Sequence, residues 1–191
     1  MNIIKNSFEE FLNTYNPTKL GFIVSQSNVE NFLRTEFAWY LARIFSESVN
    51  YKIYIELQRI DLQVISTTEK VNYFVEFGHI VNLHNVDVER GFNEKYTSDL
   101  EKFTGKNKGK FAKNKNKEFT NHFIHINLLT EFNTNSNKVC EIEESAATFV
   151  KYGKTSKAKY DINNDLKWKK IPFTWKNSNG SLVVDIKSYI L

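Results

Sequence analysis

The stretch IDLQVISTTEKVNYFVEFGHI, residues 60–80, decides the fold. Apolar and polar residues alternate in two runs, 60–65 and 71–80, and the STTEK between them has the composition of a short turn. We therefore expect two antiparallel neighbouring strands. Each strand carries a carboxylate, Asp61 in the first and Glu76 in the second, and the hairpin allows both to lie on one face of the sheet.

Helix-forming and strand-forming patterns flank this hairpin. Apolar residues recur at helical spacing in 28–45, where Asn28 is a suitable N-cap, and again in 86–103. Strand-like runs occupy 51–57 and 122–129. The resulting order is helix, three strands, helix and strand. It predicts an α/β protein in which helices pack on a mixed sheet.

The two ends of the chain carry weaker patterns. Residues 1–27 predict a short helix, a break at Pro17 and a strand at Leu20–Val24. Residues 138–152 fit either a helix or a pair of strands. The run FTWKNSNGSLVVDIKSYI near the C-terminus predicts a hairpin that turns at Asn177–Gly180.

Length and composition bound the class of protein. A chain of 191 residues that is 41% hydrophobic and 15% aromatic is long enough for a domain with its own core and too apolar to be disordered. The single cysteine, Cys140, excludes an internal disulfide framework and a cysteine-rich zinc site. We find neither an apolar run of membrane-spanning length nor the pattern of a signal peptide, so we expect a cytoplasmic protein.

The formal net charge is only +4, so the distribution of the lysines matters more than their excess. They concentrate in KFTGKNKGKFAKNKNK, residues 102–117. One interpretation is a mobile basic loop over 104–118 that binds nucleic-acid phosphates. The candidate phosphate ligands are four lysines of this segment: Lys106, Lys108, Lys110 and Lys113. The other interpretation is a solvated surface loop in a chain rich in lysine and asparagine throughout, and the sequence leaves both open.

Three acidic residues indicate one kind of chemistry. Glu36 shares the apolar side of helix 28–45, where a carboxylate is unusual, and Asp61 and Glu76 lie in apolar strands. Carboxylates gathered at one end of a sheet repel one another unless a cation lies among them. Mg²⁺ suits such a place because it binds one or two carboxylates, water and phosphate oxygens. A site of this kind can hydrolyse a phosphodiester bond.

The ordered combination resembles the PD-(D/E)XK nuclease superfamily over roughly residues 28–130. It consists of a helix carrying Glu36, Asp61 in RIDLQVI and, after the hairpin, Glu76 in YFVEFGH. Glu56 also stands where some members carry an extra acid. The later segments VERGFNEKYTSDLEKF and FIHINLL fit the helix and strand that close the αβββαβ core of that family.

The resemblance implies a restriction-endonuclease-like core with a mixed sheet. We expect residues 1–135 to form this core domain together with the N-terminal helix. Residues 136–191 would be a C-terminal extension packed on the same domain and ending in a β-hairpin.

A site and a function are implied in the same way. Asp61 and Glu76 would be the main ligands of Mg²⁺ or Mn²⁺, and the backbone carbonyl of Phe77 would complete the shell. Glu36 would be a catalytic residue that supports the metal directly or through water. The implied protein is a metal-dependent endonuclease that hydrolyses nucleic acid, DNA in the first instance, in restriction or defence. A homodimer is compatible with this interpretation.

The chain departs from the family at Gly78, where a lysine normally orients the attacking water and stabilises transition-state charge. Some members move this cation to another element, and Lys52, Lys95 and Lys102 are the candidates here. His79 is a poor substitute because it projects from the opposite face of an unbulged strand. If the cation is lost, the alternative is a catalytically inactive nuclease-fold protein that binds nucleic acid or a protein partner. A protein–protein module is a third interpretation.

The same residues also have structural interpretations. Asp61 and Glu76 could pair with lysine or arginine on a solvated sheet face, and Arg59 is a ready partner for Asp61. The string VVDIK, residues 183–187, contains an Asp-X-Lys pattern without a following core, so we take it as unrelated to the site. The four histidines show no metal-ligand spacing.

Overall fold

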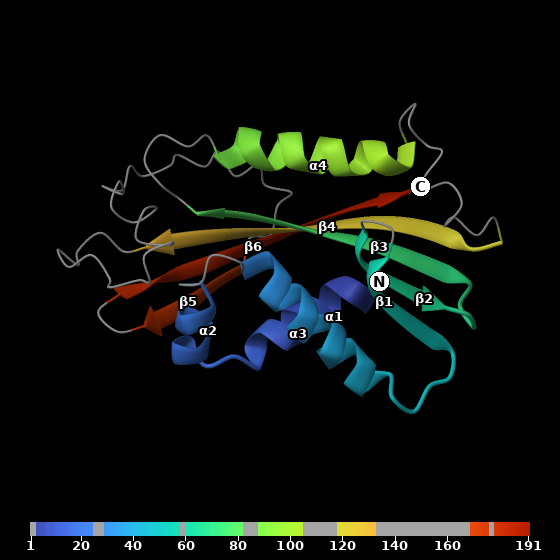
Figure 1. Cartoon of the computed structure of the whole chain (residues 1–191), viewed down its shortest axis with the longest axis horizontal. Helices are drawn as coiled ribbons and strands as arrows, with labels where there is room; N and C mark the ends of the chain where they lie inside the picture. Colours follow the sequence, from blue (N-terminus) through green and yellow to red (C-terminus); the bar gives the residue numbers. More distant parts are fainter. Residues whose placement is uncertain are drawn as a thin grey trace.

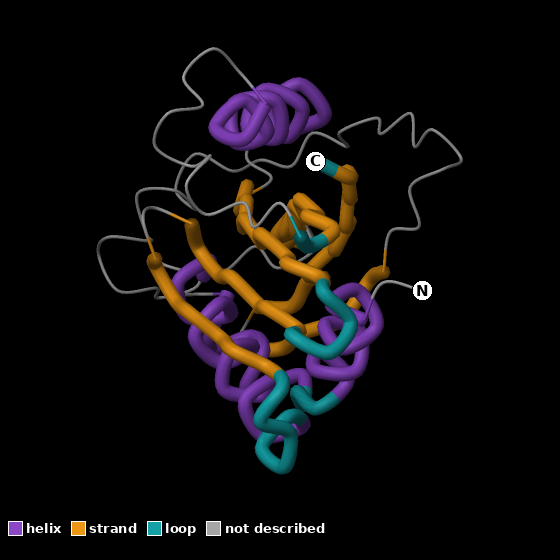
Figure 2. The backbone as a smooth tube through the Cα atoms, turned by 90° about the vertical axis from the view of Figure 1, so that its right-hand side faces the viewer, coloured by secondary structure: helices purple, strands orange, loops and turns teal. Residues whose placement is uncertain are grey.

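The computed structural model describes residues 3–24, 29–57, 60–81, 88–104, 118–132, 169–175 and 178–191. These residues form three layers, with a six-stranded sheet between two layers of helices (Figure 1). Helices α1, α2 and α3 cover one face of the sheet, and α4 covers the other (Figure 2). The predicted α/β class with a mixed sheet is confirmed. The basic segment 105–117 and residues 138–152 lie outside the described residues.

The helices on the first face owe their positions to apolar stripes. The helix bounds are α1 Ile3–Asn13, α2 Pro17–Val24, α3 Val29–Ile44 and, on the other face, α4 Val88–Thr104. In α1 the buried residues Ile4, Phe8, Phe11 and Leu12 recur at helical spacing, which turns one side of the helix toward the sheet. The predicted helices 28–45 and 86–103 correspond to α3 and α4 and are confirmed.

The predicted strand at Leu20–Val24 is wrong, because these residues belong to helix α2. Pro17 occupies the first turn, where its missing N–H leaves no helical hydrogen bond unmade. The Asn16 side chain accepts a hydrogen bond from the Lys19 N–H at 2.7 Å and caps the helix. A short apolar run looks the same in a strand and in a buried helix, and here the cap and the proline decide between them.

The sheet has the strand order β1-β2-β3-β4-β6-β5. The strand bounds are β1 Tyr51–Leu57, β2 Ile60–Ser66, β3 Val71–Val81, β4 Thr120–Phe132, β5 Lys169–Trp175 and β6 Ser178–Ile190. Strands β3 and β4 are parallel and are connected through α4, whereas the other neighbouring pairs are antiparallel. The hairpin expected at 60–80 is confirmed, with Leu62 opposite Val75 and Ser66 opposite Val71.

The C-terminal strands complete this same sheet. Strand β6 inserts between β4 and β5, with Asn127 of β4 opposite Asp185. The predicted hairpin exists, but its turn is not at Asn177–Gly180. The last pair before the reversal is Trp175 with Ser178, so Asn179 and Gly180 are already paired in the strand.

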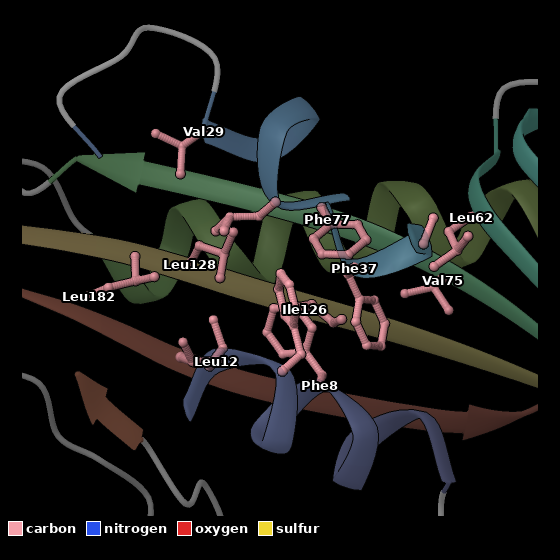
Figure 3. Packing of buried hydrophobic residues seen from close by; sticks show 14 of the residues in the cluster. Phe8, Leu12, Val29, Phe37, Leu62, Val75, Phe77, Ile126, Leu128 and Leu182 are labelled. Carbon is pink, nitrogen blue, oxygen red and sulfur yellow. The ribbon is translucent and has the colours of Figure 1, made fainter. Parts of the chain in front are cut away.

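The two faces of the sheet differ in chemistry. The main hydrophobic core lies between the sheet and α1–α3, where Phe8 and Phe37 pack edge to face at 4.8 Å between ring centroids (Figure 3). The face under α4 has a much smaller apolar cluster: Ile60, Phe74, Phe103 and Phe123. Polar groups fill the rest of that face. The buried ones on β3, β4 and β6 include Asn72, Glu76, Asn121, His125, Asn127 and Asp185.

Candidate active site

Asp61 and Glu76 lie where the pairing of β2 with β3 ends. The ladder ends at Leu62 with Val75, and Asp61 and Glu76 are the residues next to this last pair. They are close enough for the charge of Asp61 to raise the pKa of Glu76. The Asp61 side chain is 24% exposed and that of Glu76 is 4% exposed, so the pair runs from the surface into the protein. The two strand acids are therefore near one another, and their position on one face of the sheet stays a prediction.

After Glu76, the β3 backbone N–H groups on this side donate hydrogen bonds to two carboxylates instead of to strand β2. Asp61 Oδ2 accepts a hydrogen bond from the Phe77 N–H at 2.8 Å, and Glu30 Oε1 accepts one from the His79 N–H at 2.5 Å. Residues 77 and 79 direct their N–H groups to the same side because they are two apart in a strand. The edge of β3 at residues 77–79 is thus lined by negative charge.

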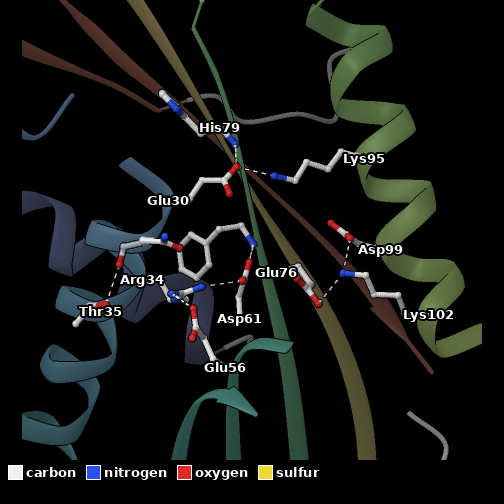
Figure 4. Close-up of polar contacts among 12 residues, drawn as sticks. Glu30, Arg34, Thr35, Glu56, Asp61, Glu76, His79, Lys95, Asp99 and Lys102 are labelled. Carbon is white, nitrogen blue, oxygen red and sulfur yellow. Dashed lines mark hydrogen bonds and ion pairs between the residues drawn. The ribbon is translucent and has the colours of Figure 1, made fainter. Parts of the chain in front are cut away.

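Arg34 of α3 neutralises the outer part of this edge (Figure 4). Its guanidinium donates to Asp61 Oδ1 at 2.9 Å and to Glu56 Oε1 at 2.5 Å. The Arg34 side chain is 9% exposed, and its Nε is buried without a hydrogen-bond partner among the described residues. Glu56 adopts a φ of 54°, an uncommon value for a residue other than glycine. This backbone geometry accompanies the departure from regular pairing at the end of β1.

Glu76 is engaged from the other side by α4. Lys102 Nζ lies 3.3 Å from Glu76 Oε1 and 2.6 Å from Asp99 Oδ1 (Figure 4). Burial raises the pKa of Glu76 to about 9, and the charges of Asp61 and Asp99 act in the same direction, while Lys102 opposes them. The Glu76 carboxyl is consequently protonated at neutral pH in the metal-free protein.

Asp99 and His125 hold Lys102 in place. Asp99 Oδ2 lies 3.1 Å from His125 Nε2, and His125 is fully buried. Burial raises the pKa of Asp99, but hydrogen bonds from His125 and Lys102 outweigh this and leave the pKa below its usual value. Glu76, Lys102, Asp99 and His125 therefore form a continuous polar chain, in which Lys102 is partly exposed and the other three residues are buried.

Lys95 occupies the space above Gly78. A Cβ added to Gly78 would lie 3.2 Å from Lys95 Cδ and 3.0 Å from His125 Cε1. The Lys95 ammonium forms an ion pair with Glu30, with Nζ 2.5 Å from Oε1, beside the edge of β3 (Figure 4). The side chains of Lys95, Asp99 and Lys102 share one side of α4 because they are spaced by four and three residues.

Glu36 does not join this group, and the expectation that it approaches the acid pair is wrong. Its carboxylate contacts the Tyr15 hydroxyl and Lys19 Nζ, each at 3.3 Å. Two residues along a helix correspond to a rotation of roughly 200°, so Glu36 points away from the side on which Arg34 reaches Asp61.

Glu30 is the acid of α3 that reaches β3, and the sequence analysis missed it. It lies one turn before Arg34 and therefore on the same side of the helix. The signal was present in this four-residue spacing, but the orientation of the helix on the sheet is fixed by tertiary packing.

The other proposed residues have separate positions. The backbone carbonyl of Phe77 points to the same side as its N–H, toward Asp61, because the two groups of one residue share a direction in a strand. Lys52 is exposed on β1, and His79 contacts Thr130 Oγ1 at 2.9 Å. Burial, followed by the charge of Lys95, lowers the pKa of His79 to about 4. The four candidate phosphate-binding lysines of the basic segment lie outside the described residues.

The Asp-X-Lys string on β6 is distant in topology from the acid pair. Asp185 is buried and accepts a hydrogen bond from Asn127 at 3.2 Å, and Lys187 donates to Asn93 of α4 at 2.9 Å. Strand β4 lies between β6 and β3, so the string is not part of the Asp61–Glu76 pair.

Two carboxylates, those of Asp61 and Glu76, are the side chains available to bind a magnesium ion at this site. Within the described part of the chain, no three His, Cys, Asp or Glu side chains converge on one metal position. Mg²⁺ is commonly bound through one or two carboxylates, with water and phosphate completing its shell, so Asp61 and Glu76 fit it. Binding would require the ion to replace Arg34 and Lys102 as the countercharge and to displace the proton of Glu76.

No family model, curated protein or solved structure matches this chain. Among the described helices, none has the length and apolar character needed to cross a membrane. The chemistry of the site therefore rests on its own residues.

Proposed function

We propose that the protein is a metal-dependent nuclease built on a restriction-endonuclease-like core. The core would consist of α3, β1, β2, β3, α4 and β4. Two features support this assignment beyond the order of the elements: the antiparallel β1-β2-β3 meander and the parallel pairing of β4 with β3 through α4. The boundary expected at residue 135, between this core domain and the C-terminal extension, stays a proposal, and strand β6 of the extension adds to the same sheet.

One observation carries the proposal. Asp61 and Glu76 lie near each other where β2 leaves β3, and basic side chains approach them from both faces of the sheet. Arg34 comes from α3, and Lys102 comes from α4. A paired acid at a strand edge within a cationic surround suits a substrate whose reacting group is a phosphodiester.

The residues divide the work of such a site. Asp61, Glu76 and the carbonyl of Phe77 would hold Mg²⁺ or Mn²⁺, which when bound supplies charge neutralisation and Lewis acidity at the phosphate. Arg34 already contacts Asp61 and could turn its guanidinium to a phosphate oxygen. Lys102 keeps a positive charge beside Glu76 and favours loss of the Glu76 proton.

Lys95 is the residue that we assign to the role of the missing lysine. Its stem lies over Gly78, so it fills the volume that a side chain on β3 would otherwise occupy. Its ammonium is held at the β3 edge by Glu30. A lysine presented from α4 can thus deliver a cation to the region normally served from the strand, and a glycine at position 78 leaves room for it.

Nucleic acid is the proposed partner, DNA in the first instance, and restriction or defence is the proposed setting. The positively charged residues of segment 102–117 support this through their sequence alone. Lys102, the first of them, is the one that lies in the described site.

A catalytically inactive nucleic-acid-binding protein is the second candidate, and a specific observation favours it. Cationic side chains of the chain already lie against both acids, Arg34 against Asp61 and Lys102 against Glu76. A site that has lost its metal could be stabilised in this manner. It would retain salt-dependent binding to polyanions without turnover.

The test combines Mn²⁺ binding by calorimetry with cleavage of plasmid and single-stranded DNA in Mg²⁺ or Mn²⁺. Glu76→Ala and Asp61→Asn should each abolish cleavage and weaken metal binding. Glu36→Ala is the matched control, since it removes a carboxylate of α3 that contacts Tyr15 and Lys19. It should leave both measurements unchanged.

The possible outcomes separate the two candidates. Metal binding through Glu76 without cleavage would select the inactive binding protein. Cleavage that survives Glu76→Ala would show that the site has been assigned wrongly. Neither metal binding nor cleavage in the wild-type protein would reject the nuclease.

A further inference from the structure

We propose that Asp99 and His125 are positioning residues that present Lys102 to the substrate, where Lys102 donates a hydrogen bond to a non-bridging oxygen of the phosphate that is cleaved. Lys95, on the same helix, takes the role of the missing strand lysine, so the two lysines have different tasks. This inference rests on the proposed nuclease function and describes how the same site binds its substrate.

The first observation is that Lys102 is held by a carboxylate of its own helix. Lys102 Nζ lies 2.6 Å from Asp99 Oδ1 and 3.3 Å from Glu76 Oε1 (Figure 4). The shorter contact identifies Asp99 as the main anchor, and the spacing of three residues puts both side chains on the same side of α4. Because Glu76 is protonated at neutral pH in the metal-free protein, Asp99 is the anion that balances the Lys102 charge.

The second observation is that Asp99 is itself fixed by a ring with little freedom to move. Asp99 Oδ2 lies 3.1 Å from His125 Nε2, and Nε2 is the donor because a carboxylate accepts. His125 is fully buried, and the Tyr96 ring packs against it edge to face, with 5.8 Å between the centroids. His125 Cε1 lies 3.0 Å from the position of a Cβ at Gly78. The two oxygens of Asp99 therefore connect a fixed imidazole to the lysine ammonium.

The third observation is that exposure increases along these three residues. The side chains of His125 and Asp99 are 0% and 10% exposed, whereas that of Lys102 is 31% exposed. The anchor is thus inside the protein, and the ammonium lies where a ligand can reach it. An unanchored surface lysine loses side-chain entropy when it binds a ligand. Lys102 is already held in place, so its contact with a phosphate costs less of this entropy.

The hydrogen-bonding capacity of Lys102 allows a contact with substrate. An ammonium group has three N–H donors. Among the described residues, Asp99 and Glu76 account for two of them, which leaves the third for a substrate oxygen. Ligands of one Mg²⁺ or Mn²⁺ ion lie about 2.0–2.6 Å from it, so a phosphate oxygen on an ion held by Glu76 would lie within about 5 Å of the Glu76 carboxylate. Lys102 already lies beside that carboxylate.

The test replaces the lysine side chain by a small molecule. Lys102→Ala should lower the single-turnover rate of DNA cleavage about 10²-fold, the usual effect of losing one preorganised donor. Propylammonium corresponds to the part of the side chain that alanine lacks. It should bind beside Asp99 and raise the rate of this variant about tenfold. Tetramethylammonium at the same concentration is the control, because it carries the charge but has no N–H to donate.

The dependence on Asp99 identifies the positioning role. When Lys102→Ala is combined with Asp99→Asn, propylammonium should restore no cleavage, since the amide offers it no negative charge. Asp99→Asn alone keeps the Lys102 charge but loses its anchor, and it should lower the cleavage rate about tenfold. Glu101→Gln is the matched control, because it converts an exposed carboxylate of the same helix into an amide. It should leave the rate unchanged.

Variants of His125 test the other end of the anchor. His125→Gln keeps an N–H donor near the position of Nε2 and should retain most of the cleavage rate. His125→Leu removes the donor and should lower the rate about as much as Asp99→Asn does. Circular dichroism and unfolding midpoints show whether these buried substitutions preserve the fold, and the propylammonium experiment does not depend on them.

A further measurement needs no catalysis. In the metal-free Lys102→Ala protein, propylammonium should raise the midpoint of thermal unfolding, because it binds the folded state beside Asp99. Tetramethylammonium should have no such effect, and neither should propylammonium in the variant that also carries Asp99→Asn.

The outcomes distinguish this inference from the nuclease assignment. A wild-type protein that cleaves no DNA would reject the nuclease and, with it, the contact between Lys102 and substrate. Wild-type cleavage that survives Lys102→Ala would overturn the inference and leave the nuclease standing. The inference also fails if propylammonium acts equally well after Asp99→Asn. It fails too if propylammonium raises the unfolding midpoint without restoring cleavage, because Lys102 would then be only a structural countercharge.

Discussion

Lys95 of α4 lies over Gly78 of β3, with its Cδ 3.2 Å from the position of a Cβ at residue 78. A glycine in a central strand is ordinarily a weakness, since it offers no side chain to pack. Here the packing is supplied by a side chain from another element. The relationship explains how a strand with glycine at this position keeps a filled interior next to the acid pair.

Gly78→Ala is expected to destabilise the protein by about 1–2 kcal/mol, the typical effect of overpacking a filled site. The added methyl would lie 3.0 Å from His125 Cε1, and the His125 ring is fully buried and held by Asp99. Lys95 can move, but this ring cannot do so without breaking its contact. Denaturant unfolding measures the change.

The double variant Gly78→Ala with Lys95→Ala separates the two neighbours. Removing the lysine stem relieves one close contact and leaves the other. If the double variant were as stable as Lys95→Ala alone, the His125 ring would not be the obstacle that we infer. For the same reason, Gly78→Lys should be tolerated poorly even when Lys95 is shortened.

Lys95→Met is expected to reduce DNA cleavage by about 10²–10³-fold while leaving Mn²⁺ affinity within a small factor. Methionine retains most of the apolar stem over Gly78 and removes the charge, so the fold should be preserved. The measurement is single-turnover cleavage under saturating metal.

Lys19→Met is the control for Lys95→Met, because Lys19 is an exposed lysine that pairs with Glu36 outside the site. Equal activity in Lys95→Met and wild type would remove Lys95 from the assignment and leave Lys102 as the candidate cation. A parallel loss in metal affinity would instead indicate that Lys95 acts on the metal ligands.

The metal-free protein should lose stability as pH rises from neutrality toward 9. Burial, with the charge of Asp61 second, raises the pKa of Glu76 from 4.5 to about 9 in the folded state. Between these values the folded protein holds a proton that the unfolded chain has released. The free energy of unfolding therefore falls with pH, by at most about 1.4 kcal/mol per pH unit for one proton.

Glu76→Gln should flatten this slope, since the amide does not titrate and has nearly the same shape. Urea titrations above neutral pH isolate the effect. The pKa of His79 is about 4 in the folded state and about 6.5 in the unfolded chain, so its ring is mostly neutral in both states there. An unchanged slope in Glu76→Gln would assign the dependence to a different group.

Arg34→Met should destabilise the protein by about 1–3 kcal/mol, because it leaves Asp61 and Glu56 without their common cationic partner. We expect a destabilisation in the lower part of that range, because Glu56 is exposed and water can solvate its carboxylate when Arg34 is removed. Arg43→Met, an exposed arginine of the same helix, is the control. Equal unfolding midpoints for the two variants would contradict the structural importance of the Arg34 bridge.

The fold was predictable where local pattern and local structure coincide. The hairpin at 60–80 and helices α3 and α4 have long, regular periodicity, so the sequence indicated them correctly. Helix α2 was misassigned because eight residues are too short for periodicity to distinguish a helix from a strand. The placement of β6 between β4 and β5 depends on pairing between distant segments, which no local pattern encodes.

The site was predictable to a similar extent. Asp61 and Glu76 were found because both belong to one hairpin, whose register follows from its turn. Glu30 and Glu36 lie on the same helix, and choosing between them requires the rotation of α3 on the sheet. The contact of Lys95 with the space above Gly78 joins two elements that pack by tertiary structure.

The central position of β6 has a consequence for the order of folding during synthesis. Strands β1 to β4 leave the ribosome before residues 178–190 have been made, and β4 then presents an open edge along its whole length. Burial of Ile126 and Leu128 and the pairing of their backbones await a segment more than fifty residues later in the chain. Such high contact order predicts slow completion of the native sheet, and it makes the nascent β4 edge a natural substrate for chaperones.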